Sequence, residues 1–259
     1  MASTRGKFVW YELMTSDTAA AEAFYKKAIG WEAQDSGMPG MSYTVVSAGG
    51  VGMGGIMELP EEARAQGATP GWMGYIAVDD VDATTRQTAD AGGGIHKAPM
   101  DIPGVIRFSV VSDPQGAIFI PCTPLMDMSG DPPPPGTPGH GGWHELHAAD
   151  GAAAFDFYAG LFGWTKGEAV NIGPMGIYQL FKTAGQDCPA GGIMNKTPDM
   201  PRPAWVYYFN TASIRAAAAR VTDAGGRIET PPMQVPGGQW ILHARDPQGA
   251  FFAMIASAE

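Results

Sequence analysis

The pentapeptide DPQGA occupies residues 113–117 and occurs again, unchanged, at residues 246–250, which is 133 residues further along the chain. Proline at the second position of a tight turn presets φ, and glycine at the fourth position accepts positive φ. The stretch IRFSVVSDPQGAIFIPC (106–122) is therefore predicted to be a β-hairpin with DPQG as its turn. A second identical copy raises the question whether the sequence around the turn is repeated as well.

The whole unit around the turn is repeated. Shifted by 133 residues, the chain aligns Trp10 with Trp143, Glu12 with Glu145 and FY (24–25) with FY (157–158), and it aligns AGG (91–93) with AGG (224–226). The register slips only between about residues 40 and 60, where GGIM (54–57) matches GGIM (191–194), and one longer loop explains this slip. A fixed long period of this kind indicates a duplicated structural unit.

The duplication divides the chain of 259 residues into two predicted domains, 1–126 and 143–259. Between them lies DMSGDPPPPGTPGHGG (127–142), whose proline run favours an extended polyproline II spacer flanked by flexible glycines. Each predicted domain is long enough to bury a core.

The composition excludes several classes of protein. The net charge is −10, which argues against nucleic acid and against anionic membrane surfaces as partners. We expect no membrane span, because no run of 18 apolar residues occurs, and no secretory signal, because the first residues lack an apolar stretch. Cys122 and Cys188 fall at unrelated places in the repeat, so free thiols and a cytoplasmic location are expected.

Each copy has the pattern of two similar modules. KFVWYELMT (7–15) alternates like a strand, and Asp17 can cap a following helix whose apolar face carries Ala20, Phe24 and Ala28. Gly30 and Gly163 stand where a helix end favours positive φ. SYTVVSA (42–48), GVGMGGIME (50–58) and GYIAVDD (74–80) are predicted strands, and a second helix ends at ADAGG (89–93). The expected fold class is α+β, with tandem domains that each contain two βαβββ modules.

The first strand, the helix ends FYKKAIGW and FYAGLFGW, the AGG helix end and the DPQG hairpin together resemble the vicinal oxygen chelate superfamily. That superfamily includes glyoxalases, bleomycin-resistance proteins and extradiol dioxygenases, and the likeness extends over nearly the whole chain, in particular to two-domain glyoxalase-like members. The resemblance implies that paired modules curl a mixed β-sheet into a cup, and that His and Glu side chains in the cup bind a divalent metal.

The ligand positions that the resemblance implies do not carry metal ligands in this chain. They fall on Trp10 and Trp143, near Met73 and Val206, on Ile120 and Ala253, and at or beside Met57 and Met194. Indole and aliphatic side chains cannot coordinate a hard cation, and methionine sulfur is a poor ligand for one. A one-residue slip would bring in Glu58, but one carboxylate does not make a chelate. We expect no metal or other cofactor, with a divalent metal as the alternative.

The string WHELH (143–147) holds the most suggestive polar residues. On a strand, alternation places Trp143, Glu145 and His147 on one face and His144 on the other, so the two histidines cannot share an ion. Glu145 and His147 are candidate catalytic residues, and so is Glu12 in the first copy, where Met14 replaces the second histidine. A structural reading, in which these carboxylates are merely hydrogen-bonded, remains open for all three.

Aromatic and sulfur-containing side chains form the candidate ligand-binding set: Trp10, Trp143, Tyr75, Tyr208, Met57 and Met73. Tyr75 and Tyr208 lie two residues beyond ligand-equivalent positions and should point into the cup, although an ordinary aromatic core is the alternative. Trp72 and Trp205 should point toward the helices and belong to the core.

Three functions are compatible with these residues. The first is a glyoxalase/bleomycin-resistance-like protein that binds a small aromatic or amphiphilic molecule in the cup without metal. The second is a glyoxalase-like lyase or isomerase, or an oxygenase, that uses a carboxylate or an unforeseen metal. The third is a protein-interaction module. The sequence leaves open whether modules pair within one half, with the other half or with another chain, so a homodimer is a further alternative.

Overall fold

The structure, a computed structural model, describes residues 4–38, 40–125 and 133–259. In the first sequence copy the elements in chain order are β1 (Phe8–Thr15), α1 (Thr18–Ala28), β2 (Glu32–Asp35), β3 (Tyr43–Ala48), β4 (Val51–Glu58), α2 (Glu61–Ala65), β5 (Gly71–Ala77), α3 (Val81–Asp90), β6 (Gly94–Ile102), β7 (Ile106–Ser112) and β8 (Ile118–Pro124).

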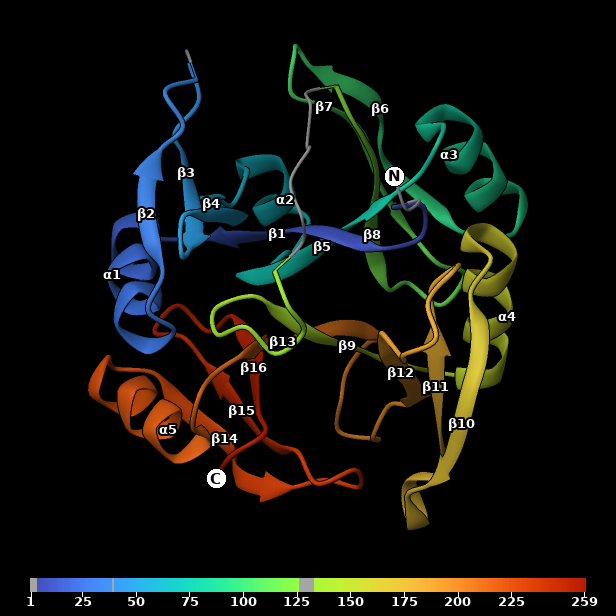
Figure 1. The fold of residues 1–259 in the computed structure, drawn as a ribbon. Coiled ribbons are helices and arrows are strands. Elements are labelled where there is room, and N and C mark those ends of the chain that lie inside the picture. Colours follow the sequence, from blue (N-terminus) through green and yellow to red (C-terminus); the bar gives the residue numbers. More distant parts are fainter. Residues whose placement is uncertain (1–3, 39, 126–132) are drawn as a thin grey trace. The chain divides into compact units, whose positions relative to one another are not determined.

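The second copy repeats this order. Its elements are β9 (Gly141–Ala148), α4 (Gly151–Phe162), β10 (Thr165–Asn171), the 3-10 turn η1 (Gly173–Met175), β11 (Ile177–Lys182), β12 (Gly191–Asn195), β13 (Ala204–Asn210), α5 (Ile214–Asp223), β14 (Arg227–Gln234), β15 (Trp240–Arg245) and β16 (Phe251–Ala256). In Figure 1 the four βαβββ modules follow one another in colour from blue to red. The predicted α+β class and the tandem modules are confirmed.

The strands form two mixed sheets with the same order. One sheet runs β2-β3-β4-β1-β5-β8-β7-β6 and the other runs β10-β11-β12-β9-β13-β16-β15-β14. Within a module the first strand lies parallel to the last, as β1 does to β4, while the other neighbours are antiparallel. Both sheets are open, because each ends at two edge strands.

The helix boundaries follow the signals in the sequence. The Asp17 side chain accepts a hydrogen bond from the backbone N–H of Ala20, as predicted, and Asp80, Asp150 and Ser213 cap the other long helices in the same way. Gly163 closes α4 in the left-handed region with φ 71°, and Gly30 follows α1 with φ 93°. Any other residue would be strained there.

The buried face of α1 differs from the prediction. Phe24 and Ala28 are buried as expected, but Ala20 is only partly buried, and Tyr25 is fully buried. Its counterpart Tyr158 is fully buried in α4. Apolar spacing alone assigns a tyrosine to the edge of the helix face, whereas a tyrosine whose hydroxyl has a buried partner can lie at its centre.

The residues cluster into two compact units that do not coincide with the two sequence copies. Among the described residues, one unit contains residues 4–9, 74–125 and 144–205, and the other contains residues 10–38, 40–73, 133–143 and 206–259. Each unit thus combines one module from the first copy with one from the second. The predicted domain limits, which follow the sequence repeat, stay a prediction.

In the unit that combines β1–β4 with β13–β16, aromatic side chains join the two modules. The ring of Tyr11 lies 5.5 Å from that of Tyr207, edge to face. Helices α1 and α5 lie side by side, and the Arg220 guanidinium donates to the backbone carbonyl of Ala28 at 3.0 Å. Trp72 points toward α1, where its indole N–H donates to Tyr25 at 2.9 Å, so its predicted core position is confirmed.

The other unit combines β5–β8 of the first copy with β9–β12 of the second copy, and it contains an equivalent tryptophan–tyrosine contact. Trp205 is also a core residue, as predicted, because its indole N–H donates to the hydroxyl of Tyr158 on α4 at 3.1 Å. The Gln115 side chain of the DPQGA turn pairs with the backbone of Asp150, with N···O distances of 2.7 and 2.8 Å. The repeated turn therefore holds the start of α4.

The register slip between the copies has a structural cause. Strands β3 and β4 are joined by residues 49–50 alone, whereas residues 183–190 join β11 to β12. Residues 127–132 of the predicted spacer lie outside the described residues. Further along the spacer, Gly139 accepts a hydrogen bond of 2.7 Å from the Trp31 indole, and β9 already begins at Gly141.

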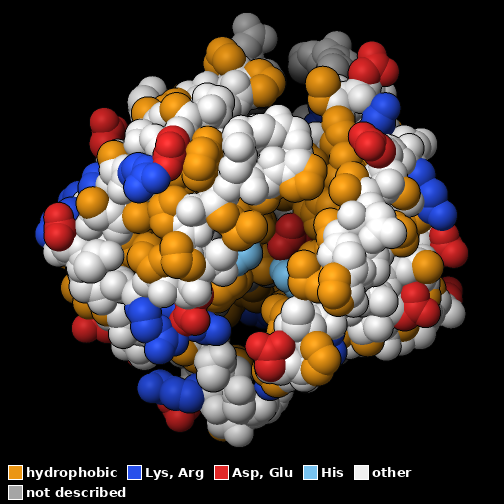
Figure 2. Space-filling model, turned by 90° about the horizontal axis from the view of Figure 1, so that it is seen from below, with side chains coloured by type: hydrophobic (Ala, Val, Ile, Leu, Met, Phe, Trp, Pro, Cys, Tyr) orange, Lys and Arg blue, Asp and Glu red, His pale blue; other side chains and the backbone are white. Residues whose placement is uncertain are grey.

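The surface agrees with the charge pattern of the sequence. Figure 2 shows acidic and basic side chains in small scattered groups among hydrophobic and uncharged ones. The longest helix in the described part of the chain is α4 with 12 residues, and none of the described helices has the length and hydrophobicity to cross a membrane.

Candidate functional site

Strand β9 presents its polar residues on one face, as the alternation predicts. His144, Leu146 and Ala148 are buried on the side of α4, while Trp143, Glu145 and His147 are only partly buried on the opposite side. We call this second side the helix-free face of β9. The sequence interpretation of WHELH as a strand, with its two histidines separated, is confirmed.

His144 belongs to the core. Its ring stacks on Phe8 with the centroids 4.0 Å apart, and its Nδ1 lies 2.8 Å from the backbone carbonyl oxygen of Ala190. Nδ1 must therefore carry the hydrogen and donate it. Burial lowers the pKa of His144 to about 4, so the ring is neutral at physiological pH.

Glu145 and His147 form a hydrogen-bonded pair with a third member that the sequence did not reveal. His147 Nε2 lies 2.8 Å from Glu145 Oε1, and the Tyr178 hydroxyl donates to Glu145 Oε2 at 2.8 Å. The Glu145 and His147 side chains are 12% and 15% exposed, so water competes little for these bonds. The other ring nitrogen of His147, Nδ1, is buried and has no hydrogen-bond partner among the described residues.

A glycine makes room for this group. Gly192 on β12 pairs with Glu145 on β9, and a Cβ atom at Gly192 would lie 2.2 Å from the Tyr178 ring. The ring therefore lies directly over the glycine backbone, which a side chain would prevent. The second glycine of the repeated GGIM motif is thus required for the contact between Tyr178 and Glu145.

The first copy has the same carboxylate, tyrosine and glycine, with Met14 in place of His147. Tyr43 donates a hydrogen bond to Glu12, the Trp10 indole N–H donates to the Tyr43 hydroxyl at 2.9 Å, and a Cβ atom at Gly55 would overlap the Tyr43 ring. Burial and the charge of Glu12 raise the pKa of Tyr43 far above its ordinary value. Glu12 is 5% exposed, so its carboxylate is largely shielded from solvent, while Trp10 and Tyr43 are partly buried.

A second polar group lies on β13–β15. The Tyr208 hydroxyl lies 2.8 Å from His243 Nε2, and His243 Nδ1 lies 3.0 Å from the Thr230 hydroxyl. Tyr208 belongs to a buried apolar cluster that also contains Val206, Ile241, Ala253 and Ile255. Trp143 packs against this cluster and stays only partly buried. The structure therefore brings together two predicted ligand-binding residues, Trp143 and Tyr208.

The remaining predicted ligand-binding residues lie elsewhere. Tyr75 is buried, with its ring 6.2 Å from that of Phe108. Met57 is partly buried on β4, where it pairs with Met14 and Tyr43 of the adjacent strands. Met73 is partly buried on β5, two residues before Tyr75.

The positions of the implied metal do not fit an ion. Trp10 and Trp143 carry indoles there, and Ile120 and Ala253 are fully buried aliphatic residues. Among residues 4–38, 40–125 and 133–259, no group of three or more His, Cys, Asp or Glu is arranged to hold a metal. The side chains at these positions do not supply the donor atoms that a divalent cation requires.

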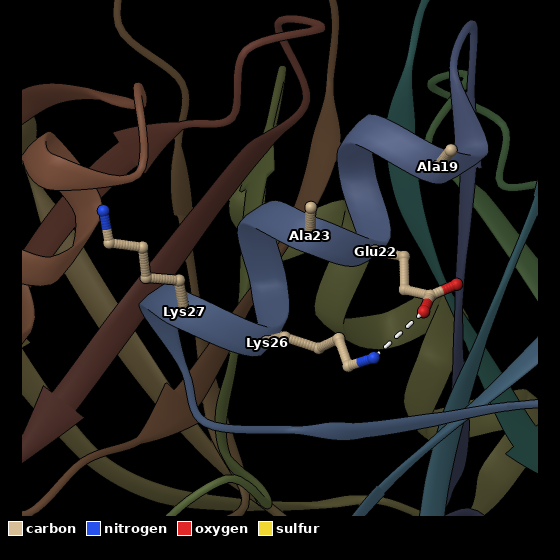
Figure 3. Close-up of a pocket in the computed structure, with 5 residues that line it drawn as sticks. All are labelled: Ala19, Glu22, Ala23, Lys26 and Lys27. Carbon is tan, nitrogen blue, oxygen red and sulfur yellow. Dashed lines mark hydrogen bonds and ion pairs between the residues drawn. The ribbon is translucent and has the colours of Figure 1, made fainter.

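A hollow elsewhere on the surface is not a better candidate. Figure 3 shows it on α1, lined by Ala19, Glu22, Ala23, Lys26 and Lys27. All five belong to one helix, and the Lys26 ammonium lies 3.1 Å from the Glu22 carboxylate one turn earlier. This is the ordinary solvated face of a helix.

Sequence reasoning missed Tyr43, Tyr178 and His243. A usable signal existed for the tyrosines, because SYTVV (42–46) and GIYQLF (176–181) each precede a GGIM strand. Glycines inside a strand pattern indicate that something large approaches the backbone. For His243 the sequence offers no signal, because Val110 stands at the matching position of the first copy.

Comparison with known proteins agrees with this architecture. The family model "Glyoxalase/Bleomycin resistance protein/Dioxygenase superfamily" matches residues 7–119 and again residues 131–254. A relative named "Putative glyoxylase CFP32" from Mycobacterium tuberculosis is 31% identical over 260 residues, covering 96% of this chain and 94% of that protein. "Anthracycline biosynthesis protein DnrV" from Streptomyces peucetius is 30% identical over 265 residues, covering 98% and 94%.

Solved structures show the same fold at low sequence identity. The Mn(II)-bound glyoxalase from Novosphingobium aromaticivorans matches with a TM-score of 0.68 and 17% identity, covering 99% of this chain and 83% of that one. The 2,3-dioxygenase LapB from Pseudomonas sp. KL28 matches with a TM-score of 0.66 and 12% identity, covering 99% and 94%. The family model accounts for nearly all of both sequence copies, and the chain belongs to the Glyoxalase/Bleomycin resistance protein/Dioxygenase superfamily.

Proposed function

We propose that this protein binds a small aromatic or amphiphilic organic molecule on the helix-free face of β9, without the metal typical of its family. The observation that carries the proposal is the position of Trp143. Its indole stands at a position where the family resemblance implies a metal ligand, packs on an apolar cluster and stays only partly buried.

An indole held in this way is a suitable platform for a flat ligand. Ring systems stack well on indole, and a ligand that buries about 150–250 Å² of apolar surface gains about 4–6 kcal/mol before the costs of association. Polar residues two and four positions along the same strand face, Glu145 and His147, would orient the ligand. A mostly apolar surface with a few fixed polar groups is typical of small-molecule sites.

The relatives support this class of ligand. DnrV is named for anthracycline biosynthesis, and the match extends over nearly the full length of both chains. Anthracyclines contain flat, fused aromatic rings that carry hydroxyl and carbonyl groups. A ligand of this chemical class would use both the indole and the polar pair on β9.

The test is isothermal titration of the full chain with an anthracycline aglycone and with smaller fused aromatics. We expect saturable binding that Trp143→Ala weakens at least about tenfold. Trp10→Ala is the matched variant, because Trp10 occupies the equivalent position of the first copy, where Met14 stands in place of His147, and it should leave binding unchanged. Binding that Trp143→Ala leaves unchanged, or that Trp10→Ala weakens as much, would contradict the site.

The metal-free part of the proposal has a separate test. Metal analysis of the purified protein is combined with thermal shifts under Mn²⁺, Zn²⁺, Ni²⁺ and Fe²⁺. We expect no stoichiometric ion and no shift above about one degree. A bound ion with a shift of several degrees would contradict metal-free binding and favour a metal-dependent enzyme.

A second candidate function is general acid–base catalysis by the C-terminal copy, as in a lyase or isomerase. The observation that favours it is the hydrogen bond between Glu145 and His147, since a carboxylate that holds an imidazole in place is a common arrangement for a general base. Small carbonyl compounds incubated with the protein in D₂O would then exchange the hydrogen next to the carbonyl. If the wild-type protein exchanges this hydrogen no faster than the His147→Met variant does, this candidate function is contradicted.

A protein-interaction function receives less support from the structure. Large exposed hydrophobic side chains in the described part of the chain are spread over β4, β6, β8, β11, β14 and neighbouring segments, as Val51, Ile95, Met100, Ile118, Leu125, Met175, Ile177 and Met233. Single exposed hydrophobic residues are normal on protein surfaces.

A further inference from the structure

One ring nitrogen of His147 is a buried polar atom for which the described residues supply no partner. Nδ1 is shielded from solvent and makes no hydrogen bond to the residues that the structure describes. Leaving such an atom unsatisfied is energetically unfavourable. In folded proteins these atoms usually bind ordered water or serve a function. His147 lies two residues from Glu145 and four from Trp143, on the face where we place the ligand.

The hydrogen bond between His147 and Glu145 fixes the role of Nδ1 in the neutral ring. An ionised carboxylate only accepts hydrogen bonds, so His147 Nε2, at 2.8 Å from Oε1, must carry a hydrogen and donate it. In the neutral ring the second nitrogen is then a lone pair, which accepts. Tyr178 donates to the other carboxylate oxygen, so both oxygens of Glu145 are engaged and the ring orientation of His147 is held.

We propose that an aromatic molecule bound on this face uncovers His147 Nδ1, which is shielded in the structure, and that Nδ1 then accepts a hydrogen bond from a phenol-type hydroxyl on that molecule. His147 thereby selects hydroxylated aromatics over otherwise identical compounds that lack the hydroxyl hydrogen. This inference rests on the proposed function and adds its ligand class. A phenolic O–H is a better donor than an aliphatic hydroxyl, because its oxygen carries negative charge more easily. A site with a buried acceptor discriminates against analogues that leave it unpaired.

The selectivity belongs to the second copy alone. In the first copy Met14 stands where His147 stands in the second, and Tyr43 links Glu12 to the Trp10 indole. Methionine offers no comparable acceptor. The chain thus contains its own reference for the effect, since His147→Met installs the residue that the first copy carries at the same position.

The experiment compares 1-naphthol with 1-methoxynaphthalene by isothermal titration. The two probes differ by one methyl group, which removes the hydroxyl hydrogen. We expect naphthol to bind at least about tenfold more tightly to the wild-type protein, which corresponds to about 1.4 kcal/mol. In His147→Met the ratio should fall to about one, because naphthol loses affinity while methoxynaphthalene does not. His96→Met, the same substitution at an exposed position on β6, should keep the wild-type ratio.

A second readout uses the wild-type protein alone and does not depend on any variant folding. In ¹⁵N spectra of the imidazole, free His147 should show a hydrogen on Nε2 and an unprotonated Nδ1. Naphthol should shift the Nδ1 resonance and methoxynaphthalene should not. The inference is overturned if Nδ1 carries a hydrogen in the free protein at pH 7, or if naphthol does not shift the Nδ1 resonance.

The binding results separate the two proposals. If both probes bind the wild type equally, or if the preference for naphthol survives in His147→Met, the inference fails while the proposed function stands. If neither naphthol, methoxynaphthalene nor the larger aromatics bind, the proposed function fails and the inference fails with it.

Discussion

Tyr158 on helix α4, in the second sequence copy, donates a hydrogen bond of 3.1 Å to Asp113, in the DPQGA turn of the first copy. Asp113 is 2% exposed, and its other carboxylate oxygen accepts the backbone N–H groups of Gln115 and Ala117 at 2.8 and 2.9 Å. The aspartate therefore closes its own turn and anchors a helix that lies 45 residues away in the sequence.

The DPQGA turn of the second copy makes the equivalent contact with the first copy. Tyr25 on α1 donates to Asp246, at 3.1 Å, in the second DPQGA turn. In each case an indole N–H donates to the tyrosine, from Trp205 to Tyr158 and from Trp72 to Tyr25. Each DPQGA turn therefore binds the first helix of the other copy, and neither copy completes these contacts alone. This reciprocal contact gives both copies of the turn a structural role.

Removing the tyrosine hydroxyl should destabilise the protein. Tyr158→Phe keeps the ring but takes a donor from Asp113 and an acceptor from the buried Trp205 indole. We expect the free energy of unfolding to fall by about 1–3 kcal/mol, the cost of leaving buried polar groups unsatisfied. Urea denaturation measures it, and Tyr25→Phe should give a similar loss. A change below about 0.5 kcal/mol for both variants would show that these bonds are not structural.

Much of the fold could be predicted because it depends on local patterns. Alternation placed Trp72 and Trp205 toward the helices and split the WHELH residues between two faces of β9, and both assignments are confirmed. Asp17 and Gly163 mark helix ends through backbone chemistry that a single residue determines. The family resemblance added the order of the modules.

The rest depends on which strands are neighbours, and one sequence does not contain that information. Tyr178 reaches Glu145 only because β11, β12 and β9 are adjacent in the sheet and Gly192 leaves the space open. The contact of Tyr158 with Asp113 joins different copies, and the repeat pattern gives no reason to expect such an exchange. For this reason the sequence left open which modules pair, and the division into compact units could not be derived from it.

The buried histidine predicts a loss of stability in mild acid. Burial lowers the pKa of His144 from 6.5 to about 4, so between these values the unfolded chain binds a proton that the folded protein does not. Stability contributed by the neutral ring is complete above pH 6.5 and is lost as pH falls toward 4, by about 3 kcal/mol. Urea denaturation from pH 7 to pH 4 should show this loss in the wild type and a smaller one in His144→Gln. If stability depends on pH equally in the wild type and in His144→Gln, His144 is not the cause of the loss.

The turn aspartates have the opposite effect. Burial raises the pKa of Asp113 and Asp246 above their ordinary value of 3.8, so the folded protein holds these protons more tightly than the unfolded chain. Their contribution to stability therefore falls as pH rises from 3.8 through the raised values. Relative to Asp113→Asn, whose amide does not titrate, the wild type should lose stability over that range. If the stability difference between the wild type and Asp113→Asn does not change with pH, or if it grows in favour of the wild type, burial does not disfavour ionisation of the Asp113 carboxyl.

Gly192 should be essential for the candidate site. A Cβ atom there would lie 2.2 Å from the Tyr178 ring, so Gly192→Ala must push the ring away from Glu145 and break their hydrogen bond of 2.8 Å. We expect lower stability and at least about tenfold weaker binding of naphthol, because Glu145 and His147 lose their fixed orientation.

The matched control is Gly160→Ala on α4, where a Cβ atom meets nothing within 4 Å. That substitution should stabilise the helix by about 0.5–1 kcal/mol and leave binding unchanged. Equal binding in both variants would show that Tyr178 does not position the pair, and would place the ligand away from this face of β9.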